Sequence, residues 1–375
     1  MGGESAALPE WIGTNVPLAP HTTLGLGGPA RYFTAAADEP ALVERLRWAA
    51  ARGLPVHVLG GGSNTVFADA GFDGLVVHVG LRGIALARSG EHVLVTAAAG
   101  ECWSALVDFC VDQGLGGIEC LAGIPGQVGA TPIQNVGAYG QEIGDVLWSV
   151  DALERGSLAR VRLAGAECEL GYRQSRFKRA DRERFVILAV TLRLRAGARP
   201  VLRYPELEAA VRAAVDLEAL APGAPALRAI RDQVVRLRRQ KSMVVDPEDP
   251  ESRSAGSFFV NPVLGPAALA ALRARLPEPQ ALPAHRAAGG TKVSAAWLIE
   301  QAGFRRGYAR RGVAVSSRHA LALVNRGGTT TALLELAWEI QQAVRARFGI
   351  ALELEPTIVG PDCSAGVLAS GSSAG

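Results

Sequence analysis

The sequence is short of the residues that build disulfide frameworks and metal centres. Its cysteines are five in number and include no Cys-x-x-Cys pair: Cys102, Cys110, Cys120, Cys168 and Cys363. This pattern argues against a disulfide framework and against a structural zinc site. The six histidines show no metal-ligand spacing, so no metal is predicted. A reducing cytoplasm fits this cysteine usage best.

The sequence also has little net charge and no long apolar runs. The formal net charge is +3, and apart from residues 228–241 the basic residues are spread out, which leaves a weak footprint for nucleic acid. Residues 1–13 carry Glu4 and Glu10 and lack the basic and apolar regions of a targeting signal, and no apolar run reaches membrane-spanning length. We therefore expect a cytoplasmic monomer that binds neither nucleic acid nor membrane.

Apolar sequence, in contrast, is plentiful. Hydrophobic residues make up 49% of the 375 residues, so two or three domains are expected. Residues 362–375 depart from this because they are rich in Ser, Ala and Gly. Such a segment cannot bury enough surface to offset its ordering entropy, so we predict a disordered tail.

Apolar spacing predicts mixed α and β structure in the first half. It indicates helices over residues 40–52 and 101–112 and strands over residues 55–59, 75–79 and 92–97. Residues 186–195 alternate apolar with other residues, the pattern of a half-buried strand, and we expect this strand to close the first large unit.

The second half predicts a bridge and a smaller α+β domain. Residues 198–240 are rich in Ala, Arg and Leu and contain a basic amphipathic helix over 227–239. The elements expected after Ser257 are a strand, a helix over 292–301, strands over 313–315 and 320–324, a helix capped by a Thr at 329–331 and ended by Gly349, and a final strand.

Two glycine-rich segments are candidates for ligand binding. Residues 60–64 follow a predicted strand, and their consecutive glycines let backbone N–H groups turn toward an anion. An ordinary turn is the alternative, since Gly and Asn are ordinary turn formers. The segment is not the Gly-x-Gly-x-x-Gly fingerprint, and no Walker motif is present. Residues 123–140 hold five glycines and two prolines. They either bring backbone close to a large flat ligand or form an elaborate structural loop.

Three side chains offer catalytic chemistry. Arg173 lies beside Tyr172, and an arginine fork suits a carboxylate because it donates two parallel hydrogen bonds. Ser257 offers a hydroxyl from a turn that precedes two phenylalanines. In residues 350–356 the apolar positions share one face, which leaves Glu353 and Glu355 on the other. A hydroxyl acid, a cation and a carboxylate suit reduction of an electron-poor double bond, although a surface charge, a locally bonded serine and a solvated strand face are the ordinary alternatives.

Together with the runs at residues 171–175 and 255–262, these segments closely resemble the UDP-N-acetylenolpyruvoylglucosamine reductase family over residues 15–360. The resemblance implies an α+β fold, with an FAD-binding domain of the PCMH/vanillyl-alcohol-oxidase type and a smaller α+β substrate-binding domain. It implies bound FAD, held more by main chain than by side chains, and NADPH as co-substrate. Gln174 departs from the family pattern, which commonly has Asp there.

The resemblance also assigns roles to residues. Arg173 activates the substrate carboxylate, Ser257 donates a proton, and the run ending in Gly360 selects Glu355 as the catalytic carboxylate. The FAD-binding residues that it implies are Gly60, Gly61, Gly62, Ser63, Asn64, Gly123, Ile124, Pro125, Gly129, Ala130, Gln134, Asn135, Gly137, Ala138 and Tyr139. The substrate-binding residues are Tyr172, Tyr204, Lys241 and Asn261.

Domain boundaries follow from the same comparison. We predict an FAD-binding domain over residues 15–197, with subdomains of about 15–85 and 86–197, a bridging segment over 198–240, a substrate-binding domain over 241–349, a final strand over 350–361 that returns to the active site, and the tail at 362–375.

The reaction implied is reduction of UDP-N-acetylglucosamine enolpyruvate to UDP-N-acetylmuramate for peptidoglycan precursors, with hydride passing from NADPH through the flavin. Two other hypotheses stay open at this point. One is a different FAD oxidoreductase of the same fold, acting on a 2-hydroxy acid or a sugar. The other is a nucleotide-sugar-binding or regulatory protein without redox chemistry.

Overall fold

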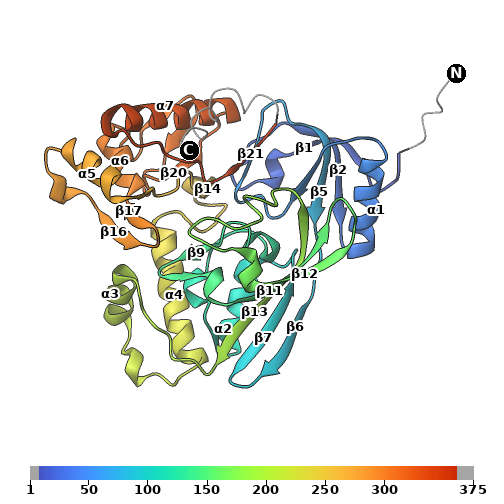
Figure 1. Ribbon diagram of the computed structural model, residues 1–375, viewed down its shortest axis with the longest axis horizontal. Helices are drawn as coiled ribbons and strands as arrows, with labels where there is room; N and C mark the ends of the chain where they lie inside the picture. Colours follow the sequence, from blue (N-terminus) through green and yellow to red (C-terminus); the bar gives the residue numbers. More distant parts are fainter. Residues whose placement is uncertain (1–7, 361–375) are drawn as a thin grey trace. The chain divides into compact units, whose positions relative to one another are not determined.

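The computed structural model describes residues 8–360, and the tail predicted at 362–375 lies outside them. The described chain forms two compact units, drawn in sequence colours in Figure 1. Unit 1 contains residues 8–17, Pro29–Gly61 and Phe72–Leu237. Unit 2 contains Leu18–Gly28, Gly62–Gly71 and residues 238–360.

Unit 1 begins with a small sheet covered by one helix. Its strands, in spatial order, are β1 (Gly13–Pro17), β2 (Pro29–Ala36), β5 (Phe72–Val79) and β3 (Val56–Leu59), with β2, β5 and β3 parallel and β1 antiparallel. Helix α1 (Glu39–Ala50) lies beside β2 (Figure 1) and buries Leu42 and Leu46 against the sheet. Asp38 caps the helix by accepting the N–H of Ala41 at 2.8 Å. The predicted helix over residues 40–52 and the predicted strands over 55–59 and 75–79 are confirmed.

The second sheet of unit 1 is antiparallel. Its strands are β12 (Arg160–Ala164), β11 (Leu147–Glu154), β13 (Phe185–Ala196), β7 (His92–Ala98) and β6 (Ile84–Ser89) in that order, with β8 (Leu115–Gly116) also paired to β13. The predicted strand at residues 186–195 is confirmed as β13, but half-burial is wrong for its first part. Ile187 and Leu188, on opposite faces, are both buried, because core residues of unit 1 cover both faces of this part of the sheet.

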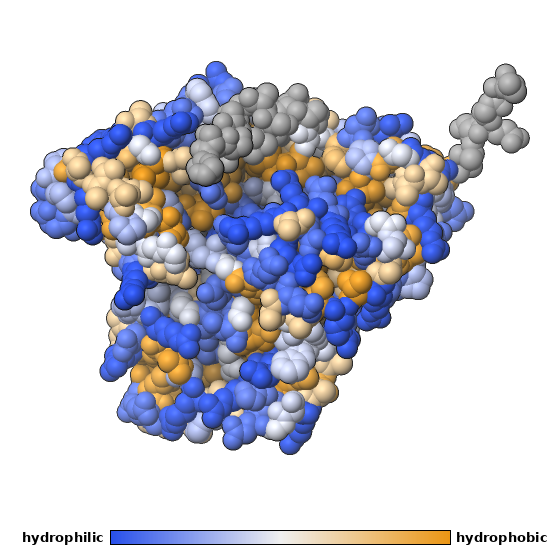
Figure 2. Space-filling view, in the orientation of Figure 1, coloured by the Kyte–Doolittle hydropathy of each residue, from blue (hydrophilic) through white to orange (hydrophobic). Residues whose placement is uncertain are grey.

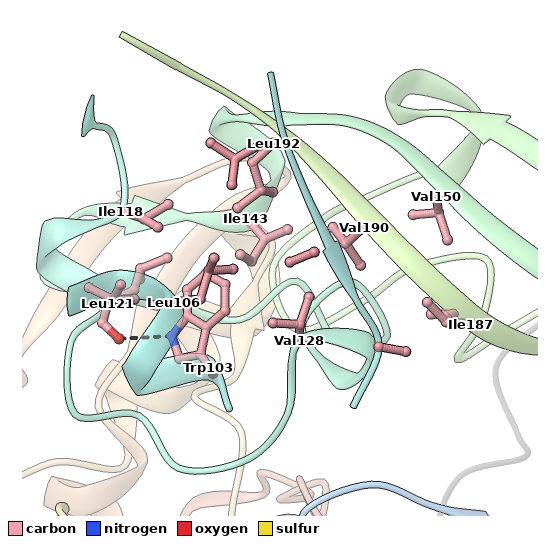
Figure 3. Packing of buried hydrophobic residues seen from close by; sticks show 14 of the residues in the cluster. Trp103, Leu106, Ile118, Leu121, Val128, Ile143, Val150, Ile187, Val190 and Leu192 are labelled. Carbon is pink, nitrogen blue, oxygen red and sulfur yellow. Dashed lines mark hydrogen bonds between the residues drawn. The ribbon is translucent and has the colours of Figure 1, made fainter. Parts of the chain in front are cut away.

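The core of unit 1 forms where this sheet meets α2 (Trp103–Asp112), as Figure 3 shows. Trp103 lies among Leu106, Val128 and Ile143, and its indole N–H donates to the carbonyl of Leu121 at 3.0 Å. A buried indole needs such a partner, since an unpaired N–H would cost free energy. Leu121, Val128 and Ile143 thereby hold the segment that carries them against the helix and the sheet.

Two further helices complete unit 1. They are α3 (Pro205–Ala214) and α4 (Ala224–Gln240), the latter being the predicted basic helix, begun three residues earlier than the sequence indicated. Its apolar face is buried, and its arginines form ion pairs with α2, including Arg228 to Asp112 at 2.7 Å and Arg231 to Asp108. The basic face is therefore used within the protein.

Unit 2 consists of short strands and three helices. One sheet has the order β14 (Ser254–Ser257), β20 (Ala322–Asn325), β19 (Val313–Val315) and β18 (Ala309–Arg310), and a second has β15 (Val263–Leu264), β17 (Gly290–Val293) and β16 (Ala284–Ala287). The helices are α5 (Pro266–Ala274), α6 (Ala295–Gln301) and α7 (Thr330–Phe348). Thr329 caps α7 and Gly349 ends it at a φ of +72°, as predicted.

Two predicted elements of unit 2 need correction. The helix expected over residues 292–301 begins only at Ala295, because Lys292 belongs to β17 and Ser294 caps the helix through the N–H of Trp297. The final strand expected over residues 350–361 is regular only at β21 (Thr357–Val359). Before it, Leu354 forms a single bridge to Phe259.

Segment Gly62–Gly71 lies in unit 2, although the sequence placed it within residues 15–85 of the first domain. Its strand β4 (Thr65–Phe67) pairs in parallel with β21. Asp69 accepts the N–H groups of Thr330 and Thr331, each at 2.8 Å, at the start of α7. These long-range bonds assign the segment to unit 2, and the predicted domain boundaries stay predictions.

Figure 2 shows hydrophobic residues as scattered patches among hydrophilic ones. Trp148 on β11 is 49% exposed, and the Arg193 guanidinium lies 5.5 Å from its ring. Among the described helices, none has both the length and the apolar character that crossing a bilayer requires.

Candidate active site

Ser257 is the last residue of β14 and is half-buried. The N–H of the next residue, Phe258, donates to the Leu321 carbonyl at 2.7 Å. Gly256 takes a φ of +73°, a left-handed conformation that favours glycine. Phe258 and Phe259 are both buried. Ser257 therefore lies on a fixed backbone and is followed in the chain by two buried aromatic residues.

The structure brings Glu355 close to this strand. The N–H of Glu355 donates to the Phe258 carbonyl at 3.0 Å, so the two residues belong to adjacent stretches of backbone. Glu355 is 9% exposed, whereas Glu353 is exposed. The two carboxylates therefore differ in burial, although Glu353 and Glu355 flank the same bridge between Leu354 and Phe259. Glu355 is the carboxylate held inside the fold.

Asn64 lies directly against the Glu355 segment. Its side-chain amide donates to the Glu355 carbonyl at 3.3 Å, and its own carbonyl accepts the N–H of Thr357 at 2.9 Å. Gly62 has a φ of +62°, and a Cβ there would lie 1.9 Å from the His21 carbonyl oxygen. Only glycine fits that position. The second half of the first glycine-rich segment is thereby fixed in unit 2.

In unit 1, the second glycine-rich segment is joined to the loop that carries Arg173. Three side-chain hydrogen bonds connect them: Asn135 to the Gly171 carbonyl at 3.1 Å, Arg173 to the Gly137 carbonyl at 3.1 Å, and Ser175 to the Ile133 carbonyl. The guanidinium carbon of Arg173 also lies 5.5 Å from the Tyr172 ring. The arginine is therefore positioned by the same segment that we expect to hold FAD.

Asn135 uses its side chain within the protein. It is 2% exposed, has a φ of +47°, accepts the N–H of Gly144 at 2.8 Å and donates to Glu142 at 2.6 Å as well as to Gly171. Asparagine tolerates left-handed backbone better than most residues. Its side chain holds the loop in shape, which leaves its main chain for any contact with a cofactor.

Two of the predicted FAD-binding amides are also engaged within the protein. The N–H of Gly129 donates to the Ala99 carbonyl at 2.9 Å, and that of Ala130 donates to the Gln127 carbonyl at 3.1 Å. A Cβ at Gly129 would lie 2.6 Å from the Cβ of Ala99, so glycine is needed there for packing. These two positions support the segment.

The junction of the two glycine-rich segments in unit 1 suits a polar cofactor. A Cβ at Gly61 would lie 2.9 Å from the Cα of Gly126, so the backbones touch. Beside them, Gln127 is buried, and its Oε1 has no hydrogen-bond partner within residues 8–360. A buried polar atom without a partner fits a site that a polar ligand completes, as FAD would.

Tyr204 lies at the start of α3 on the surface of unit 1, where it is 43% exposed. Its ring meets that of Tyr139 edge to face, with centroids 5.4 Å apart. Burial, followed by the charge of Glu206, raises the pKa of the Tyr204 hydroxyl. The segment that carries Tyr204 therefore rests on the second glycine-rich segment.

Lys241 and Asn261, both predicted to bind substrate, lie in unit 2. Lys241 directly follows α4, where its N–H donates to the Arg238 carbonyl at 3.1 Å. Asn261 accepts the N–H of Ala295 at 2.8 Å through its side-chain oxygen, so this atom supports the start of α6.

Sequence reasoning missed one supporting pair. Glu119 is 2% exposed and accepts the side-chain N–H of Gln141 at 2.8 Å and the N–H of Gly117 at 2.7 Å, while Gln141 accepts the N–H of Cys120 at 2.8 Å. The only signal was a carboxylate in an otherwise apolar stretch. This network links the two ends of the second glycine-rich segment.

Comparison with known proteins gives these residues a context. A model of an FAD-binding domain matches residues 30–160, and a model of the C-terminal domain of UDP-N-acetylenolpyruvoylglucosamine reductase matches residues 248–359. An FAD-binding domain followed by a reductase domain defines the class of the protein as an FAD-dependent oxidoreductase.

Relatives cover nearly the whole chain. The UDP-N-acetylenolpyruvoylglucosamine reductases of Streptomyces coelicolor and Saccharopolyspora erythraea are 45% and 47% identical to it, over 92% of this chain and 90% and 95% of theirs. A crystal structure of the reductase from Thermus caldophilus, 24% identical, has a TM-score of 0.60 over 92% of this chain and 97% of that one, which shows a shared fold. The chain therefore belongs to the UDP-N-acetylenolpyruvoylglucosamine reductase family. The predicted family, α+β FAD-binding fold and FAD cofactor are confirmed.

Proposed function

We propose that this protein reduces UDP-N-acetylglucosamine enolpyruvate to UDP-N-acetylmuramate with NADPH, by way of bound FAD, in the synthesis of peptidoglycan precursors. The observation that carries the proposal is the 45–47% identity to two reductases of that name over 92% of the chain. The local motifs agree with it, because Arg173, Ser257 and Glu355 each lie on backbone that the fold holds in place.

FAD would supply the hydride, after being reduced by NADPH. The substrate is an enol ether that carries a carboxylate, so hydride addition to its terminal vinyl carbon places negative charge on the neighbouring carbon and the carboxylate. The role proposed for Arg173 is to donate two hydrogen bonds to that carboxylate, which lowers the energy of the charge as it develops. Hydrogen bonding of Arg173 to Gly137 prepares the guanidinium for this role.

Ser257 then donates its hydroxyl proton to the carbon that bears the charge, which completes the addition of two hydrogen atoms across the double bond. A hydroxyl is a weak acid, but an enolate-like carbon is basic enough to take its proton when the two are well placed. Glu355, buried beside the Ser257 strand, is proposed to act with Arg173 in stabilising the charge that develops on the carboxylate side.

The remaining predicted residues are proposed to bind. Lys241 and Asn261 hold the UDP-sugar. Tyr172, whose ring contacts the Arg173 guanidinium, binds substrate beside that arginine. Tyr204, whose ring contacts that of Tyr139, covers the substrate. The glycine-rich segments hold FAD at the positions given by the family resemblance. We also propose a cytoplasmic monomer with a small-molecule substrate and no nucleic-acid or membrane partner, in keeping with the small net charge of +3.

The direct test is product analysis. Purified protein is incubated with NADPH and the enolpyruvyl UDP-sugar, and the sugar is examined by mass spectrometry. We expect a product heavier by two hydrogen atoms, formed in step with the loss of NADPH absorbance. NADPH oxidation without that product would contradict the proposal, and light scattering under the same conditions tests the monomer.

A further inference from the structure

Gln127 is a residue for which neither the sequence nor the comparisons suggest a role. It lies in the second glycine-rich segment and is 8% exposed. Its side-chain nitrogen lies 3.4 Å from Nε2 of His78, while its side-chain oxygen is buried and accepts no hydrogen bond within residues 8–360. A buried carbonyl oxygen without a donor is rare in folded proteins and calls for an explanation.

The surroundings of this oxygen are the two glycine-rich segments. A Cβ on Gly60 would lie 3.2 Å from Oε1 of Gln127, so the oxygen faces the backbone of the first segment. The backbone of Gln127 itself is paired with Cys102 at the start of α2, and the Gln127 carbonyl accepts the N–H of Ala130. Main-chain bonds on either side therefore fix the residue, whereas its side-chain oxygen has no donor within residues 8–360.

The chemistry of an amide oxygen restricts its partner, because a carbonyl only accepts hydrogen bonds. The FAD diphosphate also only accepts, so it cannot be that partner. The hydroxyl groups of the ribityl chain and of the adenosine ribose can donate. We propose that the Gln127 side-chain oxygen accepts a hydrogen bond from one of these hydroxyls, which makes Gln127 a cofactor-positioning residue. The inference rests on the proposed function in that it requires FAD at the glycine-rich segments.

The test replaces Gln127 by methionine, which keeps the length of the side chain and removes the acceptor. FAD is titrated into protein stripped of flavin, with flavin fluorescence as the signal, and the melting temperature is measured with and without FAD. We expect about tenfold weaker FAD binding, equivalent to about 1.4 kcal/mol. The flavin-free variant should melt no lower than the flavin-free wild type, because it no longer buries an acceptor without a donor.

A structural role would give the opposite pattern. A lower melting temperature of flavin-free Gln127→Met with FAD affinity within twofold of wild type would overturn the inference. Gln113→Met, at the exposed end of α2, is the matched control and should change neither quantity. If the methionine variant does not fold, Gln127→Asn serves instead, since it withdraws the oxygen by one methylene and should also weaken FAD binding.

Two further arms complete the test. FMN has the flavin and ribityl chain but no adenosine, so weaker binding of both FMN and FAD locates the partner in the half of the cofactor that carries the ribityl chain, and weaker binding of FAD alone locates it in the adenosine half. Failure of wild-type protein to bind FAD would contradict the proposed function itself. Normal FAD binding by both wild type and Gln127→Met would contradict only the role of Gln127.

Discussion

At the scale of a single residue, substitution of Ser257 should distinguish flavin reduction by NADPH from reduction of the enolpyruvyl UDP-sugar. Replacing it by alanine should leave flavin reduction by NADPH nearly intact, because no role is proposed for the hydroxyl in that step. Reduction of the enolpyruvyl UDP-sugar should slow by about 10²–10⁴, the usual size of a lost general acid. Anaerobic stopped-flow absorbance measures both steps in turn. Ser89→Ala, on the exposed strand β6, is the control, and equal losses in both half-reactions of Ser257→Ala would contradict the assignment.

His57 on β3 makes the stability of unit 1 depend on pH. Burial, followed by the charge of Arg155, lowers the pKa of His57 to about 4 from its usual 6.5. Between these values the unfolded chain binds a proton that the folded protein refuses, so the free energy of unfolding falls as pH drops from about 6.5 to 4, by at most about 3 kcal/mol.

Melting temperatures measured across that pH range check this prediction. His57→Gln should flatten the decline, whereas His285→Gln, at an exposed position on β16, should leave it as in wild type. An unchanged pH profile in His57→Gln would show that other groups cause the acid sensitivity.

At the scale of structural elements, Asn135 holds the second glycine-rich segment through three side-chain hydrogen bonds. Asn135→Gly keeps the left-handed backbone and removes three side-chain hydrogen bonds, so it should lower the free energy of unfolding by about 2–3 kcal/mol. Asn135→Ala should cost about 1 kcal/mol more, because alanine disfavours that backbone. Urea unfolding measures both. Asn15→Gly is the matched control, because Asn15 also has a left-handed backbone conformation but is exposed. Equal losses of stability at the two sites would contradict the role of the Asn135 side chain.

Asp69 plays a similar part for α7 in unit 2. Burial alone would raise the pKa of Asp69, but hydrogen bonds from Thr331 and Thr330 hold that pKa below its usual value. Asp69→Ala should destabilise unit 2 by about 1 kcal/mol at neutral pH, as loss of a helix cap does. The difference from wild type should shrink as pH falls through the lowered pKa, because the protonated acid loses its charge.

Thermal unfolding at neutral and acid pH tests this. Asp73→Ala removes only an ion pair with Arg31 on the surface and should have little effect. A loss in Asp69→Ala that stays constant with pH would mean that the carboxylate charge does not contribute.

The sequence predicted helices and strands well where the information that defines them is local. The helix α1, the strand β7 and both ends of α7 follow from apolar spacing and from caps such as Thr329 and Gly349. The start of α6 was placed three residues too early because no glycine or proline lies between Lys292 of β17 and the helix, and only the Ser294 cap separates the two.

At the scale of the whole molecule, the sequence could not show which residues meet across long separations. Pairing of β4 with β21 joins segments almost 300 residues apart, and no local pattern marks it. The same pairing carries Asn64 to Glu355 and decides which glutamate is buried. Candidate residues could thus be found from motifs, whereas their hydrogen-bond partners, such as those of Asn135 and Gln127, required the structure.

The central claim, an FAD-dependent reductase of the enolpyruvyl UDP-sugar, is tested most directly by one visible absorption experiment. Purified protein is examined anaerobically, first after NADPH and then after the enolpyruvyl UDP-sugar. We predict that NADPH bleaches the flavin band and that the sugar restores it. Bleaching without recovery would contradict the substrate, and folded protein without a flavin band, even after FAD is added, would contradict the cofactor.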